Sequence, residues 1–132
     1  MYKNILVSGS SGFIGSNLVI KLNSLGFNVI TLDLAGNANY SFDISDYSKF
    51  KSIDDEIDVI FHLAGQSGGY RSLIEHELDL DWNAKGTLNI CMFAKERSIN
   101  KIIYTSSMAV YGEGDWLKET DELHPMSNYG IS

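Results

Sequence analysis

Short apolar runs recur along the chain. Isoleucine, leucine and valine dominate residues 4–8, 28–32, 57–63 and 101–105, and polar or glycine-containing segments separate these runs. Runs of this length and composition predict buried strands, and a briefer one at residues 40–43 predicts a further strand. We therefore expect five strands.

Helices are predicted between these strands. Apolar residues recur at helical spacing from residue 13 onward, and Gly26 stands where such a helix would end. A short helix is predicted at 47–53, a long one at 73–96, and a last one begins near Ser127. Strands that alternate with helices indicate a mainly parallel sheet covered on both faces, which is the doubly wound α/β class.

Length and charge limit the classes of partner. The 132 residues fit one domain, and no linker divides residues 1–132. Seventeen acidic residues against ten basic ones argue against a nucleic acid or an anionic membrane as partner. No apolar run is long enough to cross a membrane, and the N-terminus lacks a signal-peptide pattern. The single cysteine, Cys91, is predicted to be a core thiol, and one cysteine suits a reducing cytoplasm, where we expect the protein.

Three glycines follow the first predicted strand. Gly9, Gly12 and Gly15 form the spacing GxxGxxG directly before the first predicted helix. Glycines let the backbone approach a pyrophosphate closely, and the N-terminus of a helix presents free N–H groups and the positive end of its dipole. The alternative is a strand–helix turn without a ligand, but the strand–loop–helix context favours a dinucleotide.

An acidic residue ends the second predicted strand. Asp33 lies 24 positions after Gly9, where a carboxylate can accept hydrogen bonds from ribose hydroxyls and would repel a 2′-phosphate. No arginine occurs in residues 34–37 to receive such a phosphate. Alone, Asp33 would be an ordinary turn residue, but together with the glycine loop it predicts NAD rather than NADP as the cofactor.

Other polar residues are interpreted as structural. His62 ends a strand and is predicted to be packed and hydrogen-bonded, and no cysteine cluster accompanies the histidines, so no metal site is predicted. The acidic residues at 54–58 indicate a solvated turn. Two interpretations of residues 68–71 stay open: Tyr70 or Arg71 contacts a phosphate, or the segment is a mobile surface loop.

Taken in order, these motifs resemble those of a known family. The matching segments are SGSSGFIG at 8–15, DI at 43–44, HLAG at 62–65, N at 83 with GTL at 86–88, TSS at 105–107 with VYG at 110–112, and Tyr129. The chain is similar to the N-terminal part of an extended short-chain dehydrogenase/reductase of the NAD-dependent epimerase/dehydratase family, and most similar to its UDP-glucose 4-epimerase-like members.

The resemblance implies a Rossmann-type sheet that binds NAD and stops before the last strands and the C-terminal substrate domain. The domain at 1–132 would then be incomplete at its C-terminus. The resemblance assigns Phe13 and Ile14 to the pyrophosphate, Asp43 and Ile44 to the adenine, Leu63, Ala64 and Gly65 to the passage beside the nicotinamide ribose, and Asn83 and Thr105 to positions near the cofactor.

The resemblance also implies a catalytic pair. Ser107 matches the serine that hydrogen-bonds the reacting hydroxyl, and Tyr129 matches the tyrosine that exchanges its proton. The full-length relative would move a hydride from a nucleotide sugar to NAD as an epimerase or dehydratase. The family's lysine, four positions after the tyrosine, would fall one residue past Ser132, so we expect the chain to be a fragment.

Two alternatives stay open. Without that lysine, the chain can also be interpreted as a binding or interaction module that does not turn over substrate. A reductase on the same scaffold would be recognised by net production or consumption of NADH. Family members form homodimers through two helices of each subunit; the helix at 73–96 matches the first, and most of the second would follow Ser132, so the resemblance does not extend the dimer to this chain.

Overall fold

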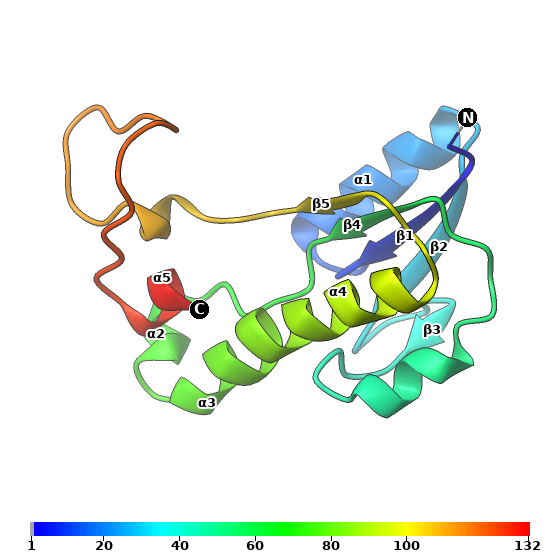
Figure 1. Cartoon of the computed structure of the whole chain (residues 1–132), viewed down its shortest axis with the longest axis horizontal. Helices are drawn as coiled ribbons and strands as arrows, with labels where there is room; N and C mark the ends of the chain where they lie inside the picture. The colour runs from blue at the N-terminus through cyan, green and yellow to red at the C-terminus, as the bar shows by residue number, and fades with distance from the viewer. Residues whose placement is uncertain (1) are drawn as a thin grey trace.

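The computed structural model, which describes residues 2–132, contains one five-stranded sheet (Figure 1). Its strands are β1 (Asn4–Ser8), β2 (Asn28–Asp33), β3 (Tyr40–Ser41), β4 (Val59–His62) and β5 (Ile102–Tyr104). They lie in the order β3-β2-β1-β4-β5, and every neighbouring pair is parallel. The predicted α/β class is confirmed. The strands end within two residues of their expected bounds.

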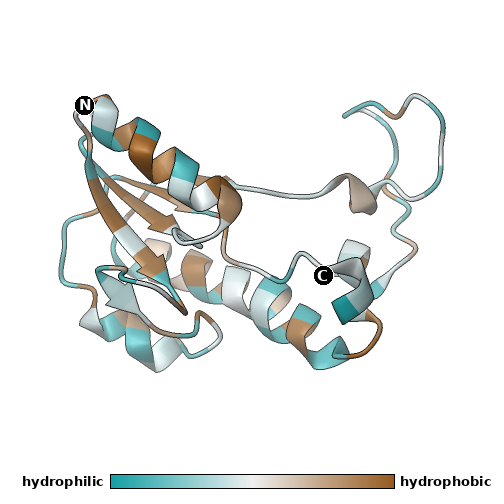
Figure 2. Cartoon of the chain, turned by 180° about the vertical axis from the view of Figure 1, so that it is seen from behind, coloured by the Kyte–Doolittle hydropathy of each residue, from teal (hydrophilic) through white to brown (hydrophobic). Residues whose placement is uncertain are grey.

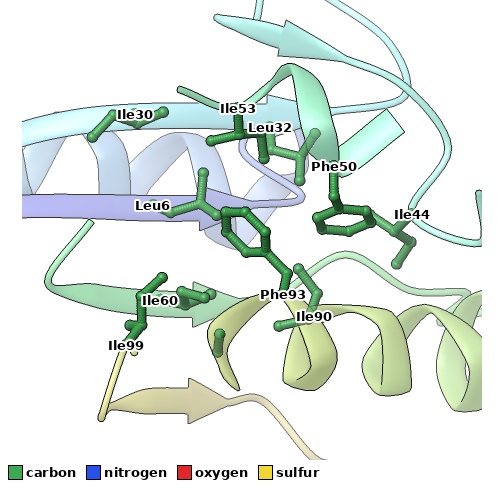
Figure 3. Packing of buried hydrophobic residues seen from close by; sticks show 11 residues of the cluster. Leu6, Ile30, Leu32, Ile44, Phe50, Ile53, Ile60, Ile90, Phe93 and Ile99 are labelled. Atoms are coloured by element: carbon green, nitrogen blue, oxygen red, sulfur yellow. The ribbon is translucent and has the colours of Figure 1, made fainter. Parts of the chain in front are cut away.

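Alternating residues of β1 pack on opposite faces of the sheet. Ile5 and Val7 meet Leu22 of α1 (Phe13–Ser24) on one face. Leu6 faces the other side, where Phe93 of α4 (Gly86–Glu96) closes the larger cluster. Figure 3 shows Leu6 and Phe93 in this larger cluster between the sheet and α4. Because a strand has a period of two, one short apolar run supplies both cores.

Hydrophobic residues and hydrophilic residues are distributed differently between the regular elements and the loops. Figure 2 shows hydrophobic colouring mainly in the strands and the two long helices, while the connecting loops are mostly hydrophilic. The short η1 (Tyr47–Ser52) is a 3₁₀ helix whose Phe50 contributes to the larger core.

None of the helices in residues 2–132 has the length and apolar character needed to span a membrane.

The helix predicted at 73–96 is present from His76 to Glu96, but it starts three residues later than predicted and is not α-helical throughout. The structure has α2 (Gly69–Ser72), α3 (His76–Leu78), a π-helical stretch η2 (Asp79–Lys85) and then α4. Apolar spacing does not reveal the cause, which is polar: Asp79 and Asn83 both hydrogen-bond Gln66 beside the sheet. A π turn inside an α-helix is rare and is found frequently at functional sites.

The prediction that Cys91 is a core thiol is also wrong, because its side chain is exposed. The buried face of α4 consists of Ile90, Phe93 and Ala94. Cys91 lies next to Ile90 and therefore about 100° around the helix from it, turned away from the sheet. Its exposure is set by the rotation of α4, which the sequence pattern left open.

After β5 the chain leaves the sheet and returns beside α2 (Figure 1). The segment contains η3 (Met108–Val110) and ends in α5 (Asn128–Ile131). The helix predicted to begin near Ser127 is α5. Gly130 packs tightly here, since a Cβ at this position would lie 2.6 Å from the Ala109 carbonyl oxygen. This return brings the end of the chain to the carboxyl edge of the sheet.

Candidate functional site

A cavity of about 750 Å³ opens at the carboxyl ends of β1, β2, β4 and β5. The strand order reverses between β1 and β4, and open α/β sheets bind ligands outside such a switch point. All residues that the sequence assigned to cofactor or catalysis line this cavity. They are Gly9, Gly12, Phe13, Ile14, Gly15, Asp33, Asp43, Ile44, Leu63, Ala64, Gly65, Asn83, Thr105, Ser107 and Tyr129.

Close main-chain packing shapes the glycine loop. Gly9 has a φ of +72°, and a Cβ there would lie 2.6 Å from the Ala64 backbone nitrogen. A Cβ at Gly15 would lie 2.0 Å from the Gly9 carbonyl oxygen. Gly12 gives α1 no side-chain cap, so the first N–H groups of α1 stay available at the cavity. These features fit an anionic pyrophosphate, which such N–H groups bind.

Asp33 is tied to the glycine loop. Its Oδ2 accepts a hydrogen bond from the Ser11 N–H at 2.8 Å, and its Oδ1 accepts one from the Ala35 N–H at 3.0 Å. A carboxylate has about four lone-pair directions, so two remain for ribose hydroxyls. No arginine is among the cavity-lining residues of the described chain, which leaves a 2′-phosphate without a partner here.

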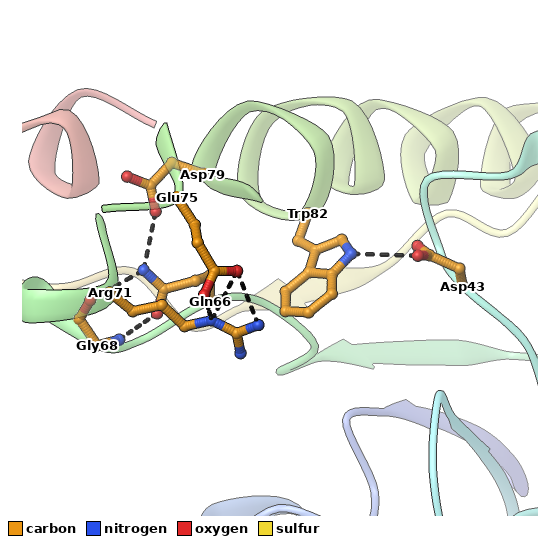
Figure 4. A network of polar contacts seen from close by, with 7 residues as sticks. All are labelled: Asp43, Gln66, Gly68, Arg71, Glu75, Asp79 and Trp82. Atoms are coloured by element: carbon orange, nitrogen blue, oxygen red, sulfur yellow. Dashed lines mark hydrogen bonds and ion pairs between the residues drawn. The ribbon is translucent and has the colours of Figure 1, made fainter. Parts of the chain in front are cut away.

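Asp43 and Trp82 meet at one end of the cavity. The Asp43 Oδ1 accepts from the Ser45 N–H at 2.8 Å, and its Oδ2 accepts from the Trp82 Nε1–H at 3.2 Å. Trp82 extends from η2 toward Asp43 (Figure 4). Trp82 was not identified from the sequence as a site residue. Its N–H had no visible partner until the fold brought Asp43 beside it.

The wall after β4 is fixed by a buried amide. Asn83 accepts a hydrogen bond from the Gln66 N–H at 2.8 Å and donates one to the Gln66 carbonyl at 3.2 Å. The Gln66 side chain in turn donates to Asp79 at 3.0 Å, and Asp79 also accepts from the Ser72 hydroxyl. Asp79 is 1% exposed. Sequence reasoning found Asn83 but missed the other members of this network, since Ser, Gln and Asp are ordinarily surface residues.

His62 is a structural residue, as predicted. Its ring is 1% exposed and lies between two hydroxyls, the Ser8 Oγ at 2.7 Å from Nδ1 and the Thr87 Oγ1 at 3.0 Å from Nε2. Burial lowers the pKa of His62 to about 4, so the ring is neutral at physiological pH. Residues 2–132 contain no group of three or more His, Cys, Asp or Glu side chains arranged to hold a metal ion.

Ser107 and Tyr129 approach the cavity from different segments. The Ser107 Oγ accepts a hydrogen bond from the Ala109 N–H at 3.2 Å at the start of η3. Tyr129 lies in α5, which Ser132 ties to the wall, because the Asn83 Nδ2 donates to the Ser132 Oγ at 3.0 Å. The fold therefore brings these two residues, 22 positions apart, to one cavity.

At residues 68–71, Arg71 is a surface residue whose side chain has partners within the protein. Its guanidinium pairs with Glu75 at 3.1 Å, and its Cζ lies 5.3 Å from the centre of the Trp82 ring. Tyr70 is 79% exposed. Neither residue lines the cavity, and this segment forms the short helix α2. Arg71 supports a cavity residue from outside.

Several known proteins are similar to this chain in sequence and in fold. A candidate UDP-glucose 4-epimerase of Methanocaldococcus jannaschii is 37% identical to this chain over 142 residues, a match that covers 97% of this chain and 47% of that protein. The UDP-glucose 4-epimerase of Thermotoga maritima, solved with UDP-glucose, superposes with a TM-score of 0.88 at 32% identity and covers 97% of this chain and 47% of its own. The Thermus thermophilus UDP-glucose 4-epimerase, solved with NAD, gives 0.87 at 27% identity, with 97% and 46% covered.

This chain therefore spans a little under half the length of the relatives that it matches. The model of the NAD dependent epimerase/dehydratase family fits residues 5–132. That interval contains the glycine loop, Asp33, Asp43, Asn83, Ser107 and Tyr129. On sequence and on fold alike, this chain belongs to the NAD-dependent epimerase/dehydratase family.

Proposed function

We propose that residues 1–132 form one dinucleotide-binding domain that holds NAD in the 750 Å³ cavity. One observation carries the proposal: fifteen residues expected to serve cofactor or catalysis come from separate segments and line a single cavity at the switch point of the sheet. The family membership and the relative solved with NAD support it. The glycine loop and Asp33 give the cavity the partners that a dinucleotide needs.

Each part of the cavity has a proposed partner on the cofactor. The N–H groups of Phe13 and Ile14 bind the pyrophosphate, because they open the helix that follows the glycines. Asp33 accepts from the adenosine ribose, and Asp43 with Ile44 contacts the adenine. The backbone of residues 63–65, with Thr105 nearby, lines the nicotinamide ribose. Asn83 holds that backbone in place through Gln66.

The proposed reaction oxidises and reduces a sugar carbon of a nucleotide sugar. NAD, when bound, supplies the acceptor for the hydride that leaves this carbon. Tyr129 takes the proton of the reacting hydroxyl and returns it. Ser107 accepts from Ala109, which leaves its own hydroxyl hydrogen to orient the sugar oxygen. This activity is proposed for the longer protein that relatives of this family represent.

Calorimetric titration of the purified chain with NAD and NADP tests the binding proposal. We expect NAD to bind more tightly than NADP by about tenfold, because the Asp33 carboxylate repels a 2′-phosphate. Asp33→Asn is expected to weaken NAD about tenfold and to narrow the gap to NADP. Asp115→Asn makes the same change at an exposed loop carboxylate outside the cavity and is the control. Equal binding of both cofactors would contradict the proposal.

Turnover separates the epimerase proposal from its alternatives. An epimerase interconverts two UDP-sugars without net change in NADH absorbance, whereas a reductase changes it stoichiometrically. Binding of NAD without any turnover by this chain would favour the inactive module. The assay needs both product analysis of the UDP-sugar and absorbance at the NADH band.

The homodimer also stays a proposal. Leu80 and Leu88 are 64% and 57% exposed on η2 and α4, and Met92 continues this line one helical turn further. An apolar stripe of this kind supports helix–helix association of the longer protein. Sedimentation analysis with Leu88→Glu would test it, since a charge there should favour the monomer.

A further inference from the structure

Trp82 forms a polar link that no part of the proposed function uses. Its Nε1–H donates to the Asp43 Oδ2 at 3.2 Å, and both residues line the cavity. The ring is half-buried, and Arg71 lies over it at 5.3 Å from the ring centre. Figure 4 shows the indole extending from η2 toward Asp43, with Arg71 beside it. Trp82 therefore connects α2 and η2 to the carboxylate.

Two hydrogen bonds fix the orientation of the Asp43 carboxylate. Its Oδ1 accepts from the backbone N–H of Ser45, which belongs to the same turn. That contact alone leaves the carboxylate free to rotate about its Cβ–Cγ bond, because terminal sp³–sp² torsions are broad. The Trp82 N–H removes this freedom, since it approaches from a different element and holds the other oxygen.

An oriented carboxylate distinguishes between purine bases. An ionised carboxylate only accepts hydrogen bonds, so it binds an exocyclic amine and is repelled by an exocyclic oxygen. Adenine carries an amine at its 6-position, whereas hypoxanthine carries an oxo group there. The discrimination is strongest when the carboxylate lone pairs have a fixed direction, because binding then pays no ordering cost.

Trp82 is itself held in place. Arg71 contacts the ring and is paired with Glu75 at 3.1 Å, one helical turn further along. A cation over an indole face is attracted by the ring quadrupole. The neighbouring Asn83 anchors the π turn on Gln66. The indole therefore has contacts from both α2 and η2.

We propose that Trp82 is a positioning residue for base specificity: its N–H orients Asp43 so that the site prefers a 6-amino purine dinucleotide to a 6-oxo one. The proposal rests on the proposed function, since it requires NAD in this cavity. It goes further by assigning the choice of base to a residue outside the motifs.

The test compares NAD with its hypoxanthine analogue, nicotinamide hypoxanthine dinucleotide. Affinities are measured calorimetrically for the wild-type chain and for Trp82→Phe, which keeps an aromatic ring for Arg71 but removes the N–H. We expect wild type to prefer NAD by about tenfold and Trp82→Phe to prefer it by only about twofold. Trp116→Phe is the matched control, because Trp116 is the second of two tryptophans and is 93% exposed.

Two further measurements keep the outcome decisive. Thermal unfolding shows whether Trp82→Phe remains folded. Arg71→Met removes the cation but leaves the Trp82 N–H, and we expect it to reduce the preference by about twofold, less than Trp82→Phe does. In the Trp116→Phe chain, Trp82 is the one remaining tryptophan, so any tryptophan fluorescence comes from it. We expect this fluorescence to change when NAD binds, because Trp82 lines the cavity.

The outcomes separate this inference from the proposed function. If wild type binds neither dinucleotide, the proposed function fails. If wild type prefers NAD and Trp82→Phe retains the full preference, the function stands and the inference is overturned. An equal loss of affinity for both dinucleotides in Trp82→Phe would also overturn it, because that is the signature of a merely structural role.

Discussion

At the glycine loop the cavity wall is main chain packed on main chain, whereas the end of the chain beside Tyr129 is tied to the rest of the wall by a side-chain hydrogen bond from a distant segment. A Cβ on Gly15 would lie 2.0 Å from the Gly9 oxygen, six residues away. Tyr129, in contrast, belongs to a four-residue helix tied to Asn83 through Ser132. The glycine loop has no room to adjust, whereas the link between α5 and Asn83 depends on a polar side-chain contact.

This difference teaches where the cavity is vulnerable. Main-chain packing cannot relax around an added atom, so a small change in the loop affects the whole β1–α1 connection. A side-chain contact near the surface can be replaced by water at small cost. Between these extremes lies the buried network of Gln66, Ser72 and Asp79, which combines distant segments with full burial.

The largest effect is expected at the glycine loop. Gly15→Ala should lower the free energy of unfolding by about 4 kcal/mol, because its Cβ meets backbone atoms that cannot move aside. Denaturant unfolding measures this loss, and NAD binding should disappear with it. Gly69→Ala is the matched control, since a Cβ at Gly69 has no neighbour within 4 Å. Similar losses in both variants would refute the packing argument.

The next largest effect is expected in the buried network. Asp79→Ala should destabilise the chain by about 3 kcal/mol, because Ser72 and Gln66 both lose their acceptor in a buried environment. Asp81→Ala removes an exposed carboxylate from the same helical stretch, whose Lys85 partner lies at 3.7 Å. That control should change stability by less than about 0.5 kcal/mol. A loss of stability in Asp79→Ala as small as that in Asp81→Ala would show that water enters the network.

A pH-dependent effect is expected from His62. Burial lowers the pKa of His62 to about 4, against about 6.5 in the unfolded chain, so the unfolded state takes up the proton first as pH falls. Stability is therefore full above pH 6.5 and is lost as pH falls toward 4. Between pH 7.5 and 5 the loss should reach about 2 kcal/mol.

Unfolding curves of wild type and His62→Gln at several pH values isolate this contribution. The variant should show a flatter profile between pH 6.5 and 4 than wild type. His124→Gln serves as the control, because His124 is an exposed histidine whose side chain pairs with the exposed Glu122. Parallel profiles for wild type and His62→Gln would contradict the assignment of a buried neutral ring.

The smallest effect is expected at the far end of the chain. Ser132→Ala removes the hydroxyl that accepts from Asn83 and donates to the Tyr129 carbonyl. We expect a loss of about 0.5 kcal/mol, because Ser132 is half-exposed and water can replace it. Amide hydrogen exchange of α5 should rise more than that of β1. Unchanged exchange in α5 would show that Asn83 does not hold this helix.

The predictions from sequence differed in quality for a physical reason. The strands and the first helix were predicted well because their signals lie within a few consecutive residues. Within the helix predicted at 73–96, the π-helical stretch was missed because apolar spacing carries no information about Asp79 and Asn83 turning toward Gln66. The helix α4, on which Cys91 is exposed, follows directly after this π-helical stretch.

The candidate site shows the same division. The glycine spacing and Asp33 could be found because strand, loop and helix follow one another directly. Asn83, Ser107 and Tyr129 were found only through a family resemblance, and their roles remain predictions. Trp82 was missed, because its partner Asp43 lies 39 residues earlier and neither residue alone indicates the contact.

The sequence by itself therefore determined the alternation of strands and helices, the parallel α/β class, and a glycine-rich loop of the kind that binds phosphate, followed by an acidic residue at the end of the second strand. Each of these follows from periodicity and backbone sterics over short distances. The tertiary structure alone decided the π turn, the buried Asp79 network, the neutral His62 and the link between Trp82 and Asp43. These depend on desolvation and on hydrogen bonds between side chains that only the folded sheet brings together.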